Sequence, residues 1–350
     1  MSRKLKVGIL GLGRAGAGMH TGEIKANSDK IEIVAVCDID AGRAKEVGEK
    51  LGVAYYTDIN DFLKDKNMDM VSVATFSADH TAHSRLALEA GFYVFVEKPI
   101  ATSQAQADEI AELNKKYPGK IYIRQNRRFE PTFQHVREII ASGILGKIHT
   151  IKLCRNSFSR RNDWQTLLSM DGGQLNNWGP HLIDHALQFL NYEVDSVWSE
   201  LKLLAAQGDA EDSVKIIMRG KDGLTVDIEI YGGNAMADNI YGVYGSRGAL
   251  QAPSSKELKL KYIDPDYELK PYPVNTGHPD GFNFADNAEL PWKTETLEVA
   301  PALKVDLTSC YRYVAESIVD GKEYPVTVEQ ALEVVKICEI VKSQSPFYNK

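Results

Sequence analysis

The chain has 350 residues, of which 43% are hydrophobic and 25% are charged. That length exceeds the size that one hydrophobic core usually reaches, so we expect two domains, and the composition excludes a disordered or fibrous protein. The 41 basic and 48 acidic residues give a net charge of −7. No basic run is present that would neutralise a series of phosphates, so nucleic acid is not an expected partner.

The cysteines and the apolar runs bear on the cellular compartment. The four cysteines are far apart and form no CxxC pair, which favours reduced, buried thiols over a zinc site or a disulfide framework. The start of the chain is basic and then apolar, but the apolar run is short and broken by glycines, so we interpret it as a strand rather than a signal peptide. No stretch approaches the roughly 18 apolar residues of a membrane span. We therefore expect a cytoplasmic protein without membrane contact.

Residues 6–123 alternate short β-branched runs with longer amphipathic segments, a pattern typical of βαβ units. The predicted strands are KVGIL, IEIVAVC, MVSVAT, YVFVE and KIYIR, and the predicted crossover helices cover 41–51, 80–90 and 105–116. Strands that are almost continuously apolar are buried on both faces, which indicates a parallel sheet between helices. We predict an α/β fold whose N-terminal domain, residues 1–125, is a doubly wound Rossmann domain.

The rhythm changes after residue 124. A helix is predicted over 131–143, and five strand-like stretches follow with few helices between them: IHTIKLC, SVWSELKLLAA, SVKIIMRG, LTVDIEIYG and IYGVYGSRGALQA. This favours a mostly antiparallel sheet in a second, α+β domain over 126–350. Residues 265–301 receive no element and are a candidate lid or oligomer contact. Helices are predicted over 305–320 and 328–343, and the last is a candidate to pack on the first domain.

The sequence Gly11-Leu12-Gly13-Arg14-Ala15-Gly16 lies between a predicted strand and a predicted helix, where a GxGxxG motif binds the pyrophosphate of a dinucleotide. Gly11 permits the tight turn, Gly13 lets the pyrophosphate approach the backbone, and Gly16 lets the helix pack close to its strand. The helix N-terminus stabilises the negative charge. We expect this loop, with Ala15, to hold the cofactor. Arg14 is either a pyrophosphate contact or an exposed cation.

Asp38 ends the second predicted strand, 22 residues beyond Gly16, where a carboxylate accepts hydrogen bonds from the adenosine ribose. It favours NAD, because it would repel the 2′-phosphate of NADP. Arg43 keeps NADP possible, since it either reaches such a phosphate or is a solvated helix residue. Thr75 and His80 follow the third main strand and are further cofactor candidates, although His80 would look the same as a polar helix start.

A second motif is Glu97-Lys98-Pro99, which together with the glycine loop resembles the glucose-fructose oxidoreductase and inositol dehydrogenase family (Gfo/Idh/MocA). Three longer stretches agree with it. GFYVFVEKPIATS resembles the strand and turn of that motif, RRFEPTFQHVREIIASGILGKI resembles the start of the second domain, and DGGQLNNWGPHLIDHALQFL resembles the active-site helix. The similarity covers most of the chain and is weakest over 264–300.

The resemblance implies an NAD(P)-dependent oxidoreductase acting on CH–OH groups of a small carbohydrate or polyol. It implies a second domain whose large open sheet serves the substrate site and the subunit contacts of a homodimer or homotetramer. The active site is then expected in the cleft between the domains. Ligands of such sheets bind beyond the carboxyl ends of the strands. Lys98 lies at such an end, and both it and the neighbouring Glu97 are cofactor candidates.

Three residues are the catalytic candidates. Lys98 precedes a proline, which biases it away from helical geometry, so its ammonium can project into the cleft and stabilise an alkoxide; the alternative is a surface pair with Glu97. His181 lies where the resemblance places the active-site histidine, and we assign it as general base in oxidation. Many family members have aspartate where this chain has Asn177, and an amide cannot raise the pKa of that histidine.

Asp184 and His185 share a helix face with His181. Asp184 either binds a substrate hydroxyl, orients a neighbouring cation, or is a carboxylate favoured in a first helical turn. The two histidines have metal-ligand spacing, but no third ligand is evident, so we expect no metal. The substrate-binding candidates from other segments, each with a surface or salt-bridge role as its alternative, are Arg127, Arg161 and Trp164.

The sequence thus predicts reversible oxidation of a secondary alcohol on a sugar, glycoside or cyclic polyol, with NAD as hydride acceptor. Two other hypotheses stay open. One is a non-catalytic NAD(H)-dependent sensor or regulator, and the other is an enzyme that cleaves glycosides through transient oxidation by a retained NAD.

Overall fold

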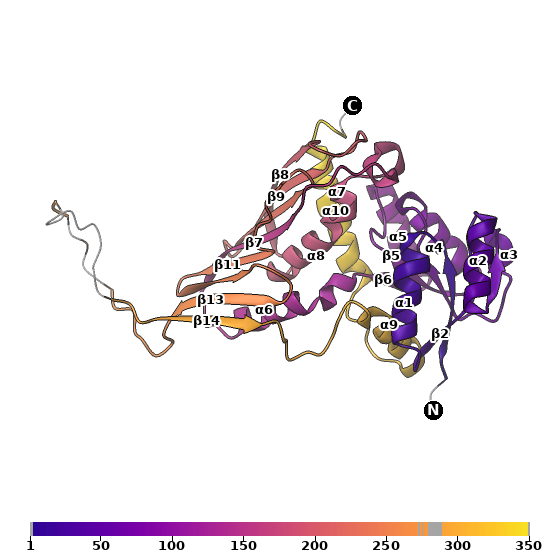
Figure 1. The fold of residues 1–350 in the computed structure, drawn as a ribbon, viewed down its shortest axis with the longest axis horizontal. Coiled ribbons are helices and arrows are strands. Elements are labelled where there is room, and N and C mark those ends of the chain that lie inside the picture. The colour runs from indigo at the N-terminus through magenta and orange to yellow at the C-terminus, as the bar shows by residue number, and fades with distance from the viewer. Residues whose placement is uncertain (1–2, 272–273, 275, 279–288, 349–350) are drawn as a thin grey trace.

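The structure is a computed structural model that describes residues 3–271, 274, 276–278 and 289–348. Its first domain is a parallel sheet of six strands in the order β3-β2-β1-β4-β5-β6. Its helices flank that sheet (Figure 1). The strands are β1 (Leu5–Leu10), β2 (Ile31–Cys37), β3 (Ala54–Tyr56), β4 (Met70–Val73), β5 (Tyr93–Glu97) and β6 (Ile121–Arg124). The helices are η1 (Arg14–His20), α1 (Thr21–Ala26), α2 (Ala41–Leu51), α3 (Ile59–Phe62), α4 (His80–Glu89) and α5 (Gln104–Lys116).

Local chemistry explains these elements. The central strands β1, β4 and β5 are almost entirely buried, as their continuous apolar runs predict for a sheet covered on both faces. Helix α2 begins where the Asp40 side chain accepts the backbone N–H of Arg43, and it ends at Gly52, whose φ is 68°. A side-chain cap and a left-handed glycine are the usual start and stop signals of a helix.

The second domain is a sheet of eight strands in the order β14-β13-β12-β11-β7-β10-β9-β8. Neighbours are antiparallel except for the parallel pair of β7 and β10. The strands are β7 (Ile148–Asn156), β8 (Val194–Lys202), β9 (Ser213–Gly220), β10 (Thr225–Tyr231), β11 (Tyr241–Gly245), β12 (Gly248–Ala252), β13 (Glu257–Ile263) and β14 (Trp292–Glu298). The predicted fold class, a Rossmann domain followed by a mostly antiparallel sheet, is confirmed.

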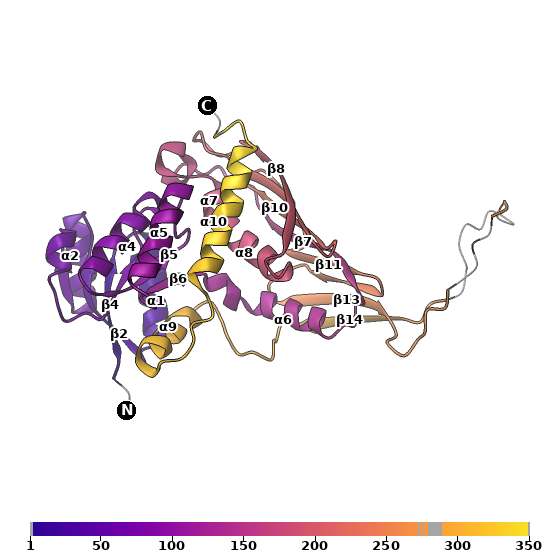
Figure 2. The same cartoon turned by 180° about the vertical axis from the view of Figure 1, so that it is seen from behind.

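The helices of the second domain lie on the side of the large sheet that faces the Rossmann domain (Figures 1 and 2). They are α6 (Pro131–Ala141), α7 (Gln174–Asn177) and α8 (Gly179–Phe189). The opposite face of the sheet is turned away from the first domain. The cleft between the domains is lined by Lys98 and Pro99, which follow β5, and by Asn176 of α7 and Pro180 of α8.

The last two helices join the domains. Helix α9 (Ser309–Asp320) packs on α1, β1 and β2, and its residues Cys310, Tyr311 and Val314 belong to the core of the Rossmann domain. Helix α10 (Val328–Ser343) packs against α5 and β6 of the first domain and against α8 of the second (Figure 2). Helices α9 and α10, which follow the large sheet in the sequence, thus complete the core of the Rossmann domain.

Three strands are absent from the sequence-based assignment. Strand β3 has only three residues, and β13 and β14 form an edge hairpin in which β14 is almost wholly exposed. An exposed edge strand needs no apolar alternation, so periodicity gives little signal there. Part of the 265–301 stretch lies outside the described residues. Among the described residues, no helix is long and apolar enough to cross a membrane.

Candidate active site and cofactor site

The glycine loop follows β1, and its three glycines differ in their surroundings. Gly11 has a φ of 90°, a conformation that favours glycine. A β-carbon on Gly16 would lie 1.9 Å from the carbonyl oxygen of Gly11, whereas one on Gly13 would meet nothing within 4 Å. The first and third glycines therefore serve the turn and the close packing of η1. The open surface at Gly13 is where a pyrophosphate would fit.

The helix behind the loop begins as a π-helix, η1, with no side-chain cap at its start. Its first residue, Arg14, is exposed, and Ala15 follows it at the surface. Uncapped N–H groups and the positive end of the helix dipole favour an anion at this point. The residues present fit the pyrophosphate of a dinucleotide, and Arg14 lies where it can add a contact from solvent.

Asp38 lies directly beyond β2 and is buried. Its carboxylate accepts the backbone N–H of Leu12 at 2.7 Å and that of Asp40 at 2.9 Å, so the glycine loop and the end of β2 are held together by one side chain. Arg43 Nη1 lies 3.5 Å from Asp38 and its other nitrogen 3.6 Å from Asp40. Arg43 is therefore paired with both carboxylates, and its charge partly offsets the negative charge of Asp38 that disfavours the 2′-phosphate of NADP.

His80 joins the loops that follow β4 and β5. Its Nδ1 lies 2.7 Å from the carbonyl oxygen of Pro99, and its Nε2 lies 3.2 Å from that of Thr75. Burial lowers the pKa of His80. The Thr75 hydroxyl lies 3.0 Å from the Nδ1 of His83. A neutral imidazole has one N–H, so His80 donates to one of these two carbonyl oxygens, and its ring lies between the segments that follow β4 and β5.

Lys98 lies just beyond β5, and its bond to Pro99 is cis. Its ammonium donates to the backbone carbonyl of Asn177 at 2.8 Å, and the Asn177 Oδ1 is 3.5 Å away. Asn177 ends α7, so this contact crosses from the first domain to the second. Burial lowers the pKa of Lys98 to about 8, the nearby cations Arg124 and Arg127 act in the same direction, and Glu97 opposes them.

His181 lies in the first turn of α8, one helical turn beyond Asn177. It is 8% exposed, and its Nδ1 makes no hydrogen bond to the described part of the protein. Burial, followed by the charges of Lys98 and Arg127, lowers the pKa of His181 well below its usual value. The imidazole is therefore neutral near pH 7. A buried, unpaired ring nitrogen is unusual, and the exposed 8% of the residue lies at atoms other than Nδ1.

Asp184 and His185 support α8 instead of facing the cleft. The Asp184 carboxylate accepts Arg128 Nη2 at 2.6 Å and Nε at 2.8 Å, which matches the alternative in which Asp184 orients a neighbouring cation. His185 lies between the Arg127 carbonyl at 3.0 Å and the Tyr241 hydroxyl at 3.2 Å. Within the described ranges, no group of three His, Cys, Asp or Glu residues is arranged to hold a metal ion.

The predicted substrate residues lie around this cleft. Arg127 pairs with Glu130 at 3.2 Å, and its guanidinium lies 4.3 Å from the ring centre of Trp178. Trp164 packs edge-on against Phe76 of the first domain at 5.1 Å between ring centres, so an aromatic pair spans the cleft. Arg161 donates to Asp163 at 2.6 Å. Arg161 also lines one pocket together with Gln174, Asn177 and Glu211.

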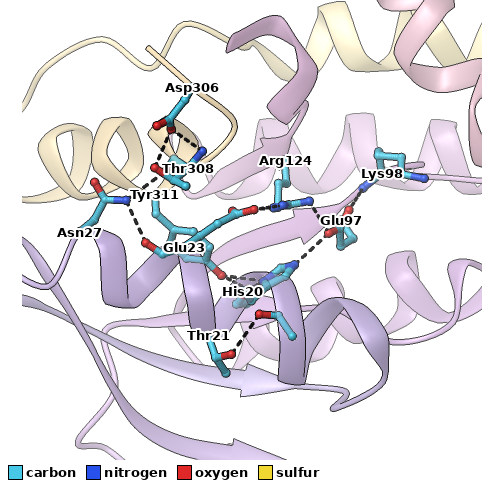
Figure 3. A network of polar contacts seen from close by, with 12 residues as sticks. His20, Thr21, Glu23, Asn27, Glu97, Lys98, Arg124, Asp306, Thr308 and Tyr311 are labelled. Carbon is cyan, nitrogen blue, oxygen red and sulfur yellow. Dashed lines mark hydrogen bonds and ion pairs between the residues drawn. The ribbon is translucent and has the colours of Figure 1, made fainter. Parts of the chain in front are cut away.

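Glu97 differs from the other predicted cofactor residues. It is 5% exposed, and its carboxylate is taken up inside the first domain by His20 and Arg124 instead of being presented to the cleft (Figure 3). Sequence reasoning missed His20 and Arg124 entirely. One signal was available, because Arg124 ends the strand Ile121–Arg124 after two isoleucines and a tyrosine, and a charged residue in a buried strand requires a buried partner.

Comparison with known proteins agrees with this architecture. Residues 5–124 match the model of the oxidoreductase family with an NAD-binding Rossmann fold, and residues 133–251 match the GFO/IDH/MocA C-terminal domain. The chain is 28% identical to the myo-inositol 2-dehydrogenase of Thermotoga maritima over 272 residues, which cover 74% of this chain and 78% of that protein. It is 24% identical to a scyllo-inositol 2-dehydrogenase (NADP(+)) of Bacillus subtilis, over 97% of this chain and 94% of that one.

A solved structure of an NAD-binding protein from Listeria innocua has the same fold. Its TM-score is 0.83 at 24% sequence identity, with 98% of this chain and 97% of that chain covered. The two family models match the first domain and part of the second, and they confirm the resemblance and the NAD-binding domain predicted from the sequence. The chain is an NAD-binding oxidoreductase that belongs to the GFO/IDH/MocA family.

Proposed function

We propose that this oxidoreductase interconverts a secondary alcohol and a ketone on a sugar, glycoside or cyclic polyol, with NAD(H) as the hydride carrier. The observation that carries the proposal is the meeting of Lys98, from the end of β5, with Asn177 and His181, from α7 and α8. They meet beyond the carboxyl ends of a parallel sheet, where such folds bind their ligands. The glycine loop lies at the same edge of that sheet.

The residues divide the chemistry as follows. Bound NAD supplies the hydride acceptor, held by the glycine loop and by Asp38. In oxidation, the hydroxyl proton passes to the imidazole of His181, which is neutral near pH 7 and therefore able to accept it. The Lys98 ammonium stabilises the negative charge that develops on the alcohol oxygen. In reduction the same groups act in reverse.

The surroundings favour a polyhydroxylated substrate. Asn177 and Arg161 line one small pocket, and both side chains carry groups that can bond a hydroxyl. We assign Trp164, which packs edge-on against Phe76, to the C–H surface of a ring. Two relatives are named for activity on inositols. Asp38 favours NAD. Arg43 lies 3.5 Å from Asp38, and its positive charge makes binding of NADP possible; NADP is the cofactor in the name of one relative. A homodimer or homotetramer formed through the open sheet completes the proposal.

The first experiment offers NAD and a panel of inositols, free sugars and glycosides to the purified protein, and follows the NADH absorbance band. We expect at least one member to produce NADH, and Lys98→Ala to abolish the signal while NADH binding, measured by fluorescence, is retained. Unchanged turnover in Lys98→Ala would contradict the mechanism. NADH binding without turnover would favour a sensor, and release of free sugar without net NADH would favour redox-assisted glycoside cleavage.

A further inference from the structure

A series of buried polar groups lies behind the strand end that carries Lys98 (Figure 3). The Glu97 carboxylate accepts three hydrogen bonds: from His20 Nε2 at 2.9 Å, from Arg124 Nη1 at 2.7 Å and from the backbone N–H of Lys98 at 3.1 Å. His20 and Arg124 are 0% and 2% exposed. Because the third donor is the backbone of Lys98 itself, any change in the position of this carboxylate is passed to the lysine.

The same groups reach three other elements of the domain. Arg124 also donates through Nε to Glu23 of α1 at 3.1 Å. The Nδ1 of His20 lies 2.7 Å from the Ser72 hydroxyl of β4 and 2.6 Å from the Tyr311 hydroxyl of α9. The ends of β5 and β6 are thereby linked, through His20 of η1 and Arg124 of β6, to α1, β4 and α9. His20 is the last residue of η1, the helix that begins directly after Gly13.

The cluster gathers charged groups of both signs. Glu23 and Glu97 contribute two carboxylates, Arg124 contributes one guanidinium, and His20 adds a second cation only when its ring is protonated. Burial raises the pKa of Glu97, but Arg124 and His20 together hold it below its usual value, so it stays ionised. Charges are buried at a large cost unless they are paired. The Glu97 carboxylate is adjacent to Lys98, where it raises the pKa that burial lowers.

We propose that His20 and Arg124 are positioning residues that act through Glu97, fixing both the backbone and the charge of Lys98 and joining it to the helix of the cofactor loop. The claim that this positioning matters for catalysis rests on the proposed function. The claim that the cluster sets the position and proton affinity of Lys98 is independent of that function, and it can be measured without substrate or cofactor. Neither the glycine loop nor the Glu97-Lys98-Pro99 motif assigns a role to His20 or to Arg124.

The test measures the pH dependence of Lys98 acetylation by acetic anhydride, with peptide mass spectrometry as the readout and the exposed Lys115 as an internal reference. Only the neutral amine reacts, so the midpoint reports the proton affinity of Lys98. Glu97→Gln removes a neighbouring negative charge, and we expect the midpoint to fall by about one pH unit. The double variant Arg124→Met/Glu23→Gln removes one cation and its partner. Because Arg124 lowers the pKa of Lys98, the midpoint then rises.

Shifts of opposite sign cannot come from a general loss of packing. Tyr324→Phe is the matched control, because the Tyr324 hydroxyl donates to the carbonyl of Ile123 in β6 at 2.8 Å, outside the contacts to Glu97. It lowers the melting temperature and leaves the midpoint unchanged. Midpoints that stay at the wild-type value in both charge variants, or that move in the same direction, overturn the proposal. If Glu97→Gln does not fold, the sign of the shift in the double variant decides.

The role of His20 is tested by a pair of variants. His20→Gln keeps an amide N–H near the position of Nε2 and can still donate to Glu97, whereas His20→Leu cannot. With a substrate from the panel, or with myo-inositol as the probe, we expect His20→Leu to lose at least tenfold in kcat and His20→Gln to recover most of that loss. Equal kcat values in the two variants overturn this assignment. Shifted acetylation without any alcohol oxidation keeps the coupling and rejects the proposed function instead.

Discussion

The cofactor loop and the catalytic cleft are built in different ways. The loop depends on backbone space within one stretch of chain: Gly11 makes the turn, Gly16 admits the helix, and Asp38 is held by the backbone N–H of Leu12. The cleft depends on side chains brought together from two domains, with Lys98 on β5 and Asn177 at the end of α7. One site is set by local sterics, and the other is set by long-range packing.

That difference teaches where each site is vulnerable. A change in the loop should alter cofactor affinity and leave the proton chemistry intact. A change in the cleft should alter turnover or its pH dependence at unchanged cofactor affinity. Variants that change cofactor affinity and turnover together would show that the two regions are coupled. We expect such coupling at His20, because it lies in η1 behind the glycine loop and contacts Glu97, the residue before Lys98.

The largest effect is expected at His181. His181→Asn keeps a polar atom near the position of Nδ1 but cannot take a proton, so kcat should fall by roughly 10²–10⁴-fold, the usual contribution of a general base. The dissociation constant of NADH should stay within about twofold, since the change leaves the glycine loop untouched. The control is His185→Asn, one turn further along α8, where the side chain bonds the Arg127 carbonyl and Tyr241. It should cost stability and retain kcat within a few-fold; equal losses in both variants would reject His181 as the base.

Gly16→Ala should have the next largest effect, and on the other region. The new β-carbon would lie 1.9 Å from the Gly11 carbonyl oxygen, so η1 must move away from the loop, at a cost of about 1–3 kcal/mol in the free energy of unfolding. We expect NADH to bind at least tenfold more weakly in a fluorescence titration. Gly18→Ala is the matched control, because it lies in the same helix and a β-carbon there meets nothing within 4 Å. Comparable weakening in both variants would show that the packing of Gly16 is not what shapes the loop.

The same contrast explains what could be predicted from the sequence. The loop was predictable because each glycine and Asp38 is identified by its place relative to a strand, and apolar runs locate strands well. The fold class followed for the same reason. Lys98 and His181 were found through the resemblance to a known family, since no periodicity says that β5 and α8 meet.

What could not be predicted depends on distant partners. Asp184 was a substrate candidate, and only tertiary structure shows it paired with Arg128. Glu97 was a cofactor candidate until the fold placed it against His20 and Arg124. Tyr311 reaches that cluster from a helix 291 residues further along the chain than His20. A contact between residues so far apart leaves no local sequence pattern. From the sequence alone, Glu97 and Asp184 are therefore interpreted as ligand contacts instead of as partners of buried cations.

A smaller effect, on pH dependence, is expected at Asn177. Asn177→Asp places a carboxylate where Oδ1 lies 3.5 Å from the Lys98 ammonium. A neighbouring negative charge favours the protonated form of a cation, so the pKa of Lys98 should rise from about 8 and that of His181 should rise as well. Activity requires Lys98 protonated and His181 neutral. Both limbs of the kcat profile should therefore move to higher pH, by roughly one unit. Asn177→Leu removes the amide without adding charge, and its profile should stay in place; a shift in that variant would assign the effect to geometry.

The smallest effect is expected at Arg43, whose side chain is 47% exposed and lies 3.5 Å from Asp38. An exposed ion pair of this kind contributes about 0.2–1 kcal/mol, so Arg43→Ala should change the KM for NAD by no more than a few-fold. The KM for NADP should rise more than that for NAD, because the Asp38 carboxylate then faces the 2′-phosphate without a compensating cation. Lys45→Ala is the control, since Lys45 pairs with Glu49 on the same helix. The ratio of kcat/KM for the two cofactors is the quantity to measure. If kcat/KM for NADP rises in Arg43→Ala, Arg43 excludes NADP instead of contacting its 2′-phosphate. The preference for NAD would then come from Asp38 and Arg43 together.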